Sequence, residues 1–551
     1  MKTDNNIVKS FITNRDKIGE GIYLLYFALM VGARAAGLYE GMTLYNISLV
    51  IGMLLFAFKM IVTKHSAKEY LIAGAFMLLA AIVYIHTGEK GLIVCFTMML
   101  GMKNVSVRKV IKTGALVAGI IVLLKIFLGV FGFTSEIYYP QERDGIGLMF
   151  RHSLGYAHPN TLHMNVMMLS MMVMYLVTDW IANQRKLANE KKDSIDRQNI
   201  FLFFIVSIMV MGFNYYVFQY SGSRTGIMAC LVYFIVNTWL FLIKRIGVFE
   251  RTVSYLAFYI VSFIAIPLPF ILQGKIFDIV NSTIFTNRFF LARYFWENNG
   301  VSLWGIRLNS PYEPFRTYGI DMAQLYLFLQ LGLVAFVVMA LLTTWYVHQA
   351  IKFDNRSELA VLMAMLFVGI WEPLLYNLGF KNFAYVFMGA MIYKVVDGQQ
   401  LLSIRQEENS VANDISYDSI PVQISLKQIA ILFLVPLMVG VIVSAVYIAT
   451  SNAPTALYGD RAEDESGKSL GIEAVYLDEK EVEQLKSNGD IIIGYTDAET
   501  PMYKYDETIA KMEYQKRTLS TGVWSGILTF GIALCTIKMY NTFNKKEHGK
   551  A

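Results

Sequence analysis

Residues 427–450, KQIAILFLVPLMVGVIVSAVYIAT, contain no charged side chain after Lys427. About 20 apolar residues in a helix are enough to cross the ~30 Å hydrocarbon layer of a bilayer. Runs of similar length recur from Ile18 to Tyr540. The stretch predicts a membrane-spanning helix, and its repetition predicts a polytopic membrane protein.

The composition of the chain agrees with this prediction. Of its 551 residues, 55% are hydrophobic and 16% are charged, whereas a soluble globular protein carries about 25% charged residues. The mean hydropathy is +0.46. These values argue against a water-soluble multidomain enzyme. They exclude a coiled coil, a collagen and a disordered chain, and the repeated apolar runs exclude a lone signal peptide.

We expect an all-α transmembrane bundle of about 14 helices. The expected ranges are 18–36, 42–62, 69–87, 90–103, 110–133, 159–182, 200–219, 225–243, 253–273, 321–346, 357–375, 380–396, 427–450 and 518–540. Residues 1–396 would form the transmembrane core and residues 397–426 a cytoplasmic linker. Residues 427–551 would form a module of two helices.

Lysine and arginine are concentrated in alternate connections, such as Lys103–Lys112 and Arg185–Arg197. Because positive charge is retained in the cytoplasm, we expect both termini to be cytoplasmic. Three long connections, 134–158, 274–320 and 451–520, would then face outward.

The third outer connection is acidic, with fifteen carboxylates and eight basic residues. Its pattern predicts a small extracellular α/β-like insertion. The strands would be Glu473–Leu477 and Ile491–Tyr495, and the helix Asp478–Ser487.

Neither the net charge nor the cysteines indicate a nucleic-acid or metal site. The net charge of +6 is spread between apolar runs and forms no basic face, so no nucleic-acid partner is expected. Cys95, Cys230 and Cys535 all lie inside apolar runs and do not have the spacing of a metal site.

Outward arginines are the informative charges, because the topology does not require them. They are Arg34, Arg143, Arg151, Arg224, Arg288, Arg293, Arg307 and Arg316. A single arginine at a helix end can reach the lipid head groups. Several that converge favour an anionic ligand, since guanidinium groups bind phosphate bidentately, and Ser221–Ser223 before a helix offers free N–H groups to the same anion. A pyrophosphate at the outer leaflet fits this pattern.

Possible acid–base groups lie beside these arginines. Asp321 would begin the tenth helix, either as its N-cap or as a general base at the membrane surface. His158 and Asn160 precede and begin the sixth helix, where they would bind sugar or phosphate or serve structure alone. His158 and His163 have no third metal-binding residue near them in the sequence, so no metal is expected. Glu372 is best explained as the partner of an arginine.

Aromatic residues crowd the outer segments, among them Tyr318. Aromatic belts form at membrane interfaces, and sugar rings also stack on aromatic faces. Both explanations stay open.

Four segments together resemble the O-antigen polymerase and ligase superfamily (Wzy-type), especially capsular and exopolysaccharide repeat-unit polymerases of Gram-positive type. They are Arg151…Gly155…His158-Pro159-Asn160, Ser223-Arg224-Thr225-Gly226, Asn287-Arg288-Phe289 with Leu303-Trp304-Gly305, and Asp321…Leu325…Leu331-Gly332. The resemblance covers residues 130–395. It rests on the order of the segments and their shared outward side.

The resemblance implies a glycosyltransferase that needs no metal, nucleotide or other cofactor. A glycan on polyprenyl pyrophosphate would pass en bloc to another lipid-linked repeat unit. Arg224 and Arg288 would hold the pyrophosphate with Arg151 and Arg293. From their own chemistry, His158, Asn160 and Tyr318 are the further candidates for substrate binding. Asp321 stands where ligases of the superfamily have a histidine base. A carboxylate needs a raised pKa to replace that histidine.

The expected partners are the lipid-linked oligosaccharide, membrane lipids, and a chain-length regulator and flippase of the same pathway. Two helices around an external segment resemble such regulators in topology, which suggests a fused length-control module in residues 427–540. Three other functions stay open. They are a lipid-linked oligosaccharide flippase, a ligase that attaches finished polymer, and a polyprenyl-phosphate-sugar glycosyltransferase.

Overall fold

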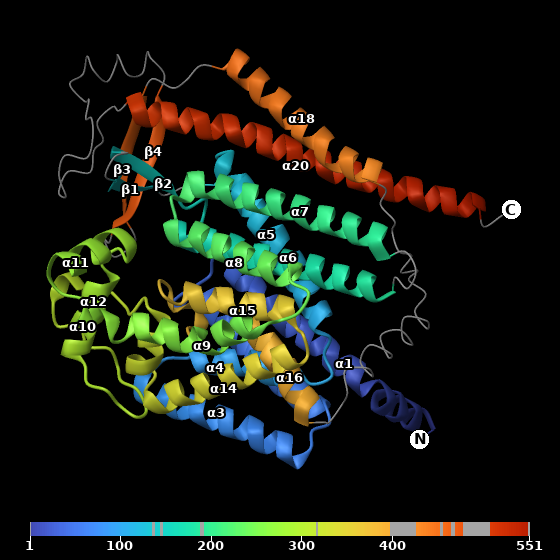
Figure 1. Cartoon of the computed structure of the whole chain (residues 1–551), viewed down its shortest axis with the longest axis vertical. Coiled ribbons are helices and arrows are strands. Elements are labelled where there is room, and N and C mark those ends of the chain that lie inside the picture. Colours follow the sequence, from blue (N-terminus) through green and yellow to red (C-terminus); the bar gives the residue numbers. More distant parts are fainter. Residues whose placement is uncertain are drawn as a thin grey trace. The chain divides into compact units, whose positions relative to one another are not determined.

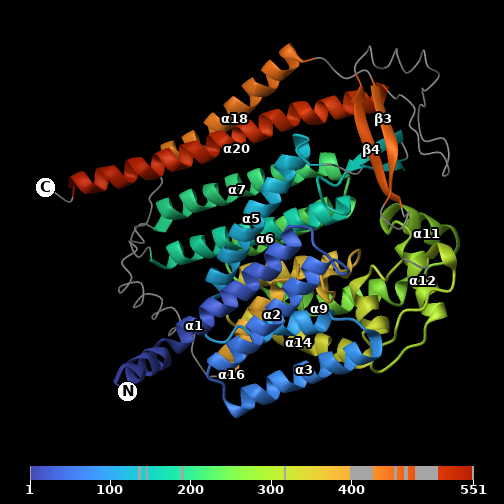
Figure 2. The same ribbon diagram turned by 180° about the vertical axis from the view of Figure 1, so that it is seen from behind.

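A computed structural model describes residues 2–134, 138–143, 147–187, 192–315, 318–396, 426–451, 456–463, 469–477 and 507–548. Most of them are helical (Figure 1; Figure 2 gives the opposite view). The chain divides into two compact units. Unit 1 comprises Met1–Val122, Asn165–Leu187 and Thr225–Glu408, and unit 2 comprises Leu123–Met164, Ala188–Arg224 and Asn409–Ala551.

The long helices are α1 (Lys2–Ala35), α2 (Thr43–Val62), α3 (Ala67–Thr87), α5 (Val107–Val130), α6 (Pro159–Leu187), α7 (Lys192–Ser221), α8 (Arg224–Leu242), α9 (Val248–Ala265), α14 (Leu333–Lys352), α18 (Leu426–Thr450) and α20 (Glu507–His548). The shorter ones are α4 (Gly91–Leu100), α10 (Leu268–Ile271), α11 (Gly274–Ile279), α12 (Arg288–Asn298), α13 (Ala323–Leu325), α15 (Arg356–Val368) and α16 (Ala384–Val396). Four further turns are the π-turns η1 (Val280–Ile284) and η3 (Tyr326–Gln330) and the 3₁₀ turns η2 (Glu313–Phe315) and η4 (Pro373–Leu375).

Eleven helices of the described chain are long and apolar enough to cross a membrane. The protein is therefore an all-α, multi-pass membrane protein, as the sequence predicts. The other three expected spans correspond to α4, α15 and α16, which have 10, 13 and 13 residues. Each of these is shorter than a straight helix that crosses ~30 Å.

The short helices α4 and α16 pack against each other inside unit 1. A Cβ on Gly389 of α16 would lie 2.0 Å from the carbonyl oxygen of Met99 in α4, so only glycine allows this approach. The Tyr393 hydroxyl donates to the Leu100 carbonyl at 2.6 Å. A helix that is apolar all round belongs in a core, and every residue of α4 except Ile93 is buried.

The structure differs from the sequence prediction at the tenth span, which was expected to be one helix over 321–346. Instead α13 and η3 come first, and α14 begins at Leu333. Gly332 interrupts the helix, because its φ of +98° lies outside the helical region. The break separates α13 and η3 from α14 and lies against the backbone of residues 302–306.

Unit 2 contains two β-hairpins. Strands β1 (Tyr138–Arg143) and β2 (Gly147–His152) are antiparallel, as are β3 (Ala456–Glu463) and β4 (Ser469–Leu477). The described strands are ordered β2-β1-β4-β3, with Tyr138 paired to Ile472. The patterns of the sequence did not predict β1, β2 or β3.

The expected strand Glu473–Leu477 is confirmed as part of β4. The expected helix 478–487, the strand 491–495 and residues 397–425 of the linker lie outside the described residues. The α/β-like insertion and the division at residues 397 and 427 therefore stay predictions.

Helices α18 and α20 lie side by side in unit 2 (Figure 2). A Cβ on Gly440 would lie 2.7 Å from the carbonyl oxygen of Gly522, and a Cβ on Gly522 would lie 2.2 Å from Ser444 Oγ. Small residues spaced four apart let membrane helices approach closely. Gly522 and Gly526 supply that spacing on α20.

Candidate functional site

The segments that carry the family resemblance fall into two groups. Arg288, Gly305 and Asp321 belong to unit 1, whereas Arg151, Asn160 and Arg224 belong to unit 2. Each unit brings its own segments together.

Arg288 is the first residue of α12, directly after Asn287, whose φ of +66° is left-handed. The side chain of Asn281 fixes this turn. It donates to Asn287 Oδ1 at 3.1 Å and accepts from the Phe290 N–H at 3.0 Å. These hydrogen bonds fix the backbone at the start of α12, where Arg288 lies.

The guanidinium of Arg288 contacts three oxygen atoms of other segments. Its Nε donates to the Trp371 carbonyl at 2.8 Å and lies 3.4 Å from Asp321 Oδ2. Its Nη2 lies 3.8 Å from Glu372 Oε1. The expected pairing of Glu372 with an arginine is confirmed. The Arg288 side chain is only 11% exposed, so its charge is largely withdrawn from water.

Asp321 is not a helix cap, because α13 begins two residues later after Met322. Its side chain is 44% exposed, so one face of the carboxylate meets solvent. Burial of its other face raises the pKa of Asp321, and the charge of Arg288 opposes that rise. The direction of this shift makes the carboxylate a better base than an exposed aspartate.

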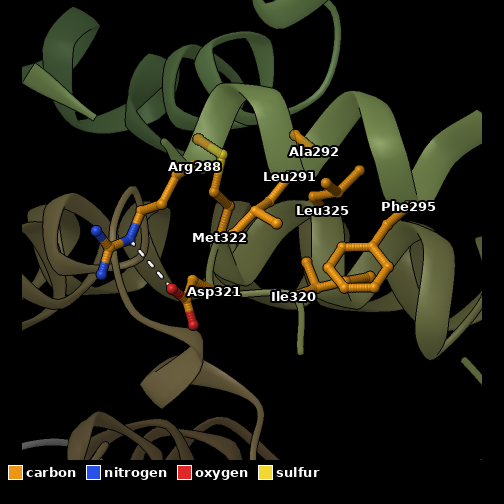
Figure 3. Close-up of a pocket in the computed structure, with 8 residues that line it drawn as sticks. All are labelled: Arg288, Leu291, Ala292, Phe295, Ile320, Asp321, Met322 and Leu325. Carbon is orange, nitrogen blue, oxygen red and sulfur yellow. Dashed lines mark ion pairs between the residues drawn. The ribbon is translucent and has the colours of Figure 1, made fainter. Parts of the chain in front are cut away.

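A small pocket adjoins the Arg288–Asp321 pair (Figure 3). It is lined by Arg288, Leu291, Ala292, Phe295, Ile320, Asp321, Met322 and Leu325. The ion pair lies at one end, and the apolar side chains extend away from it along α12 (Figure 3). Its volume is about 10 Å³, roughly the space of one water molecule. The pocket is therefore too small for a sugar or a pyrophosphate.

Glu372 and Lys381 extend the cluster into the protein. Glu372 lies in the connection between α15 and α16, and burial followed by the charge of Asp321 raises its pKa. Burial lowers the pKa of Lys381, which is 3% exposed, while Glu372 acts in the opposite sense. The sequence analysis missed Lys381. A lysine at the start of the apolar run 380–396 was the available signal.

Two glycines join the third and fourth family segments. Gly305 and Gly332 both have positive φ, +87° and +98°. A Cβ on Gly332 would lie 2.3 Å from the Gly305 nitrogen. The backbone of 302–306 bonds to that of 330–334, through Ile306 N to Gln330 O at 3.0 Å and Val334 N to Leu303 O at 3.1 Å. Only glycine allows this contact, which connects the Arg288 segment to the Asp321 segment.

In unit 2, Arg151 connects the first and second segments. Its Nε donates to the Ser221 carbonyl at 2.8 Å, and its Nη2 donates to Asn160 Oδ1 at 2.7 Å. Ser221 ends α7, and Asn160 lies in the first turn of α6. The strand, the helix end and the helix start are thereby tied together.

His158 and Arg224 have different surroundings. His158 Nδ1 accepts from the Asn160 N–H at 3.1 Å, and burial, assisted by the charge of Arg151, lowers the pKa of His158 to about 4. His158 is therefore neutral at pH 7. Arg224 is exposed at the first residue of α8, after the tight turn at Gly222. Within the described residues its guanidinium has no ion-pair partner.

Arg293 and Tyr318 do not join the Arg288 cluster through any described contact. Arg293 donates to the carbonyls of Pro269 and Leu272 and lies 3.7 Å above the Phe277 ring. It thereby holds the end of α10. Tyr318 is exposed and packs edge-on against Phe315.

The described residues include no group of three or more His, Cys, Asp or Glu side chains with metal-site geometry. Comparison of the chain with family models, with curated proteins and with solved structures finds no match.

Proposed function

We propose that this chain is a polysaccharide repeat-unit polymerase. It transfers a polyprenyl-pyrophosphate-linked glycan en bloc to another lipid-linked repeat unit at the outer face of the cytoplasmic membrane. The observation that carries the proposal is the ion pair of Arg288 with Asp321, two residues that the family resemblance assigns to the reaction. The partly exposed carboxylate and the nearly buried cation lie on rigid, glycine-fixed segments.

The proposed reaction requires few catalytic groups of the protein. The acceptor hydroxyl oxygen bonds to the anomeric carbon of the donor glycan, and the bond from that carbon to the pyrophosphate oxygen breaks. The electron pair leaves on the pyrophosphate, and the hydroxyl proton passes to Asp321. Because pyrophosphate is a good leaving group, the protein mainly positions two substrates and stabilises developing negative charge.

Arg288 and Asp321 have linked roles in this scheme. A pyrophosphate bound by Arg288 neutralises the guanidinium that now opposes the raised pKa of Asp321. Substrate binding therefore increases the basicity of the carboxylate. Arg224, exposed at the start of α8, keeps in the proposal the pyrophosphate role that the resemblance implies, as do Arg151 and Arg293. His158, Asn160 and Tyr318 are the further candidate substrate contacts.

The proposed topology has both termini in the cytoplasm and the arginine-bearing connections outside. The distribution of lysine and arginine between the apolar runs supports it.

The test is polymer production in cells that depend on this protein. Arg288→Ala and Arg224→Ala are expected to abolish polymer, because each removes a charge that holds the leaving group, while the protein stays in the membrane. Arg307→Ala is the matched control, an exposed arginine of the same outer connection to which the resemblance gives no role. Polymer of normal length and amount from Arg288→Ala, at equal protein level, would refute the proposal.

A ligase is the second candidate, since it would use the same groups on the same lipid pyrophosphate. The nature of the acceptor separates the two. A polymerase extends a lipid-linked chain, whereas a ligase moves a finished chain to another molecule.

A further inference from the structure

Helix α20 carries a stripe of polar side chains on one face. Glu513, Lys516 and Ser520 are spaced three and four residues apart, so they lie above one another on the helix. Their exposures are 2%, 9% and 1%. These residues lie in the part of α20 that is apolar enough to cross a membrane. Buried polar groups there are costly and need partners.

Strand β2 supplies partners for the first two residues of the stripe. His152 Nε2 lies 2.7 Å from Glu513 Oε2. Lys516 Nζ lies 2.6 Å from Glu513 Oε1 and donates to the Phe150 carbonyl at 3.3 Å. Both the His152 and the Glu513 side chain are at most 3% exposed. Charge-assisted contacts of this length in a buried setting are strong and directional.

Helix α7 supplies the partners of Ser520. The hydroxyls of Tyr216 and Tyr220 lie 3.0 Å and 2.6 Å from Ser520 Oγ. The Tyr220 ring packs edge-on against His152, with 4.9 Å between ring centroids. The stripe on α20 therefore touches both β2 and the last turns of α7.

Arg151 lies between Phe150 and His152 on β2. Side chains alternate between the faces of a strand, so Arg151 and His152 leave β2 on opposite sides. Arg151 bonds to Ser221 and Asn160, while His152 bonds to Glu513. Strand β2 is thereby fixed from both faces.

We propose that Glu513 and Lys516 of α20 are positioning residues for Arg151. They hold β2 from one face so that the Arg151 guanidinium meets the end of α7 and the start of α6 from the other. This inference rests on the proposed role of Arg151 as a pyrophosphate contact. It makes the last helix part of the transfer apparatus, whereas a length-control module would be separable from it.

The first test is a double-mutant cycle on polymer amount, measured at matched membrane levels of protein. Arg151→Ala and Glu513→Ala are each expected to lower polymer at least tenfold. The double variant should fall within about threefold of Arg151→Ala alone, because residues that act through one another are non-additive. Glu513→Asp should restore part of the loss. Gln515 is exposed on the same helix, and Gln515→Ala should give the polymer amount of the wild type.

Two results of this cycle would overturn the inference. One is full polymer from Glu513→Ala, and the other is a double variant in which the two single losses multiply. A shortened or lengthened polymer of normal amount from Glu513→Ala would favour length control instead and would also count against positioning.

The second test does not depend on transfer activity. Arg151→Cys is labelled with a water-soluble maleimide in a Cys535→Ser background, since Cys95 and Cys230 are buried. Addition of Glu513→Ala should raise the labelling rate at least tenfold, and addition of Gln515→Ala should not. An unchanged rate would refute the positioning role. If Arg288→Ala keeps its polymer, the proposed function fails, but this labelling still decides how α20 acts on Arg151.

Discussion

Arg288 lies between two carboxylates, Asp321, whose side chain is 44% exposed, and Glu372, whose side chain is 16% exposed. Glu372 and Lys381 continue this series of charges inward from Asp321 and Arg288. Under the proposed function, the inner end of this series fixes the geometry and the exposed face of Asp321 meets the substrate. The poorly hydrated guanidinium of Arg288 thus has a carboxylate partner on two sides.

The proposed role of Asp321 as a base predicts how the rate of glycan transfer depends on pH. Its basic form is the ionised carboxylate, and its pKa is raised above the ordinary value of 3.8 by burial. The rate of glycan transfer should therefore be maximal at neutral pH and should fall as the external pH drops through the raised pKa, which lies above 3.8. Initial rates of polymer formation by spheroplasts at graded external pH measure this limb.

Asp321→Asn is the matching variant, because it keeps the shape and cannot take a proton. A general base contributes about 10²–10⁴-fold to rate, so the variant should lose activity on that scale. The rate that remains in this variant should not decrease as the external pH is lowered over the same range. A wild-type profile in Asp321→Asn would exclude the carboxylate as the base.

Among the helices, the close contact between α18 and α20 depends on glycines that leave room for the facing backbone. Gly522→Leu should separate the two helices, since a Cβ there already meets Ser444 Oγ at 2.2 Å. Overpacking typically costs about 1–3 kcal/mol, so the purified protein should unfold at a lower temperature. Gly531→Leu is the control, as a Cβ at Gly531 meets nothing within 4 Å. Equal midpoints for the two variants would contradict this account of the packing.

Apolar runs predicted the elements well, because a spanning helix depends on local composition alone. The break at Gly332 could not be predicted in this way. Hydropathy continues through Leu325–Leu342, and the cause of the break is a contact with Gly305 from an earlier segment. Hairpin β1–β2 was missed because YYPQER in β1 has no clear alternation and contains Pro140.

Arg288 and Asp321 could be named from the sequence, since both are charges in places that topology does not explain. The ion pair between them needed the structure. The contact of His152 with Glu513 could not be predicted, because no local pattern connects strand β2 with helix α20. Lys381 was missed, because the apolar run 380–396 hides a buried charge whose partner, Glu372, lies in the preceding connection.

At the scale of the whole molecule, both compact units are assembled from distant parts of the chain. Unit 2 takes residues from Leu123–Met164, from Ala188–Arg224 and from Asn409–Ala551. Such an assembly makes a C-terminal truncation a poor probe of length control, because it also removes the partners of His152 and Tyr220. Point variants on α20 are the cleaner probe.

The central claim is that this chain joins lipid-linked repeat units at the outer face of the membrane. The most direct measurement is the set of lipid-linked glycans, with their membrane side, in a strain that lacks the protein and carries wild type, Arg288→Ala or Arg307→Ala. The account predicts single repeat units on the outer face in the deletion strain and with Arg288→Ala, and polymer with the other two. Long unattached chains, or units trapped on the inner face, would contradict it.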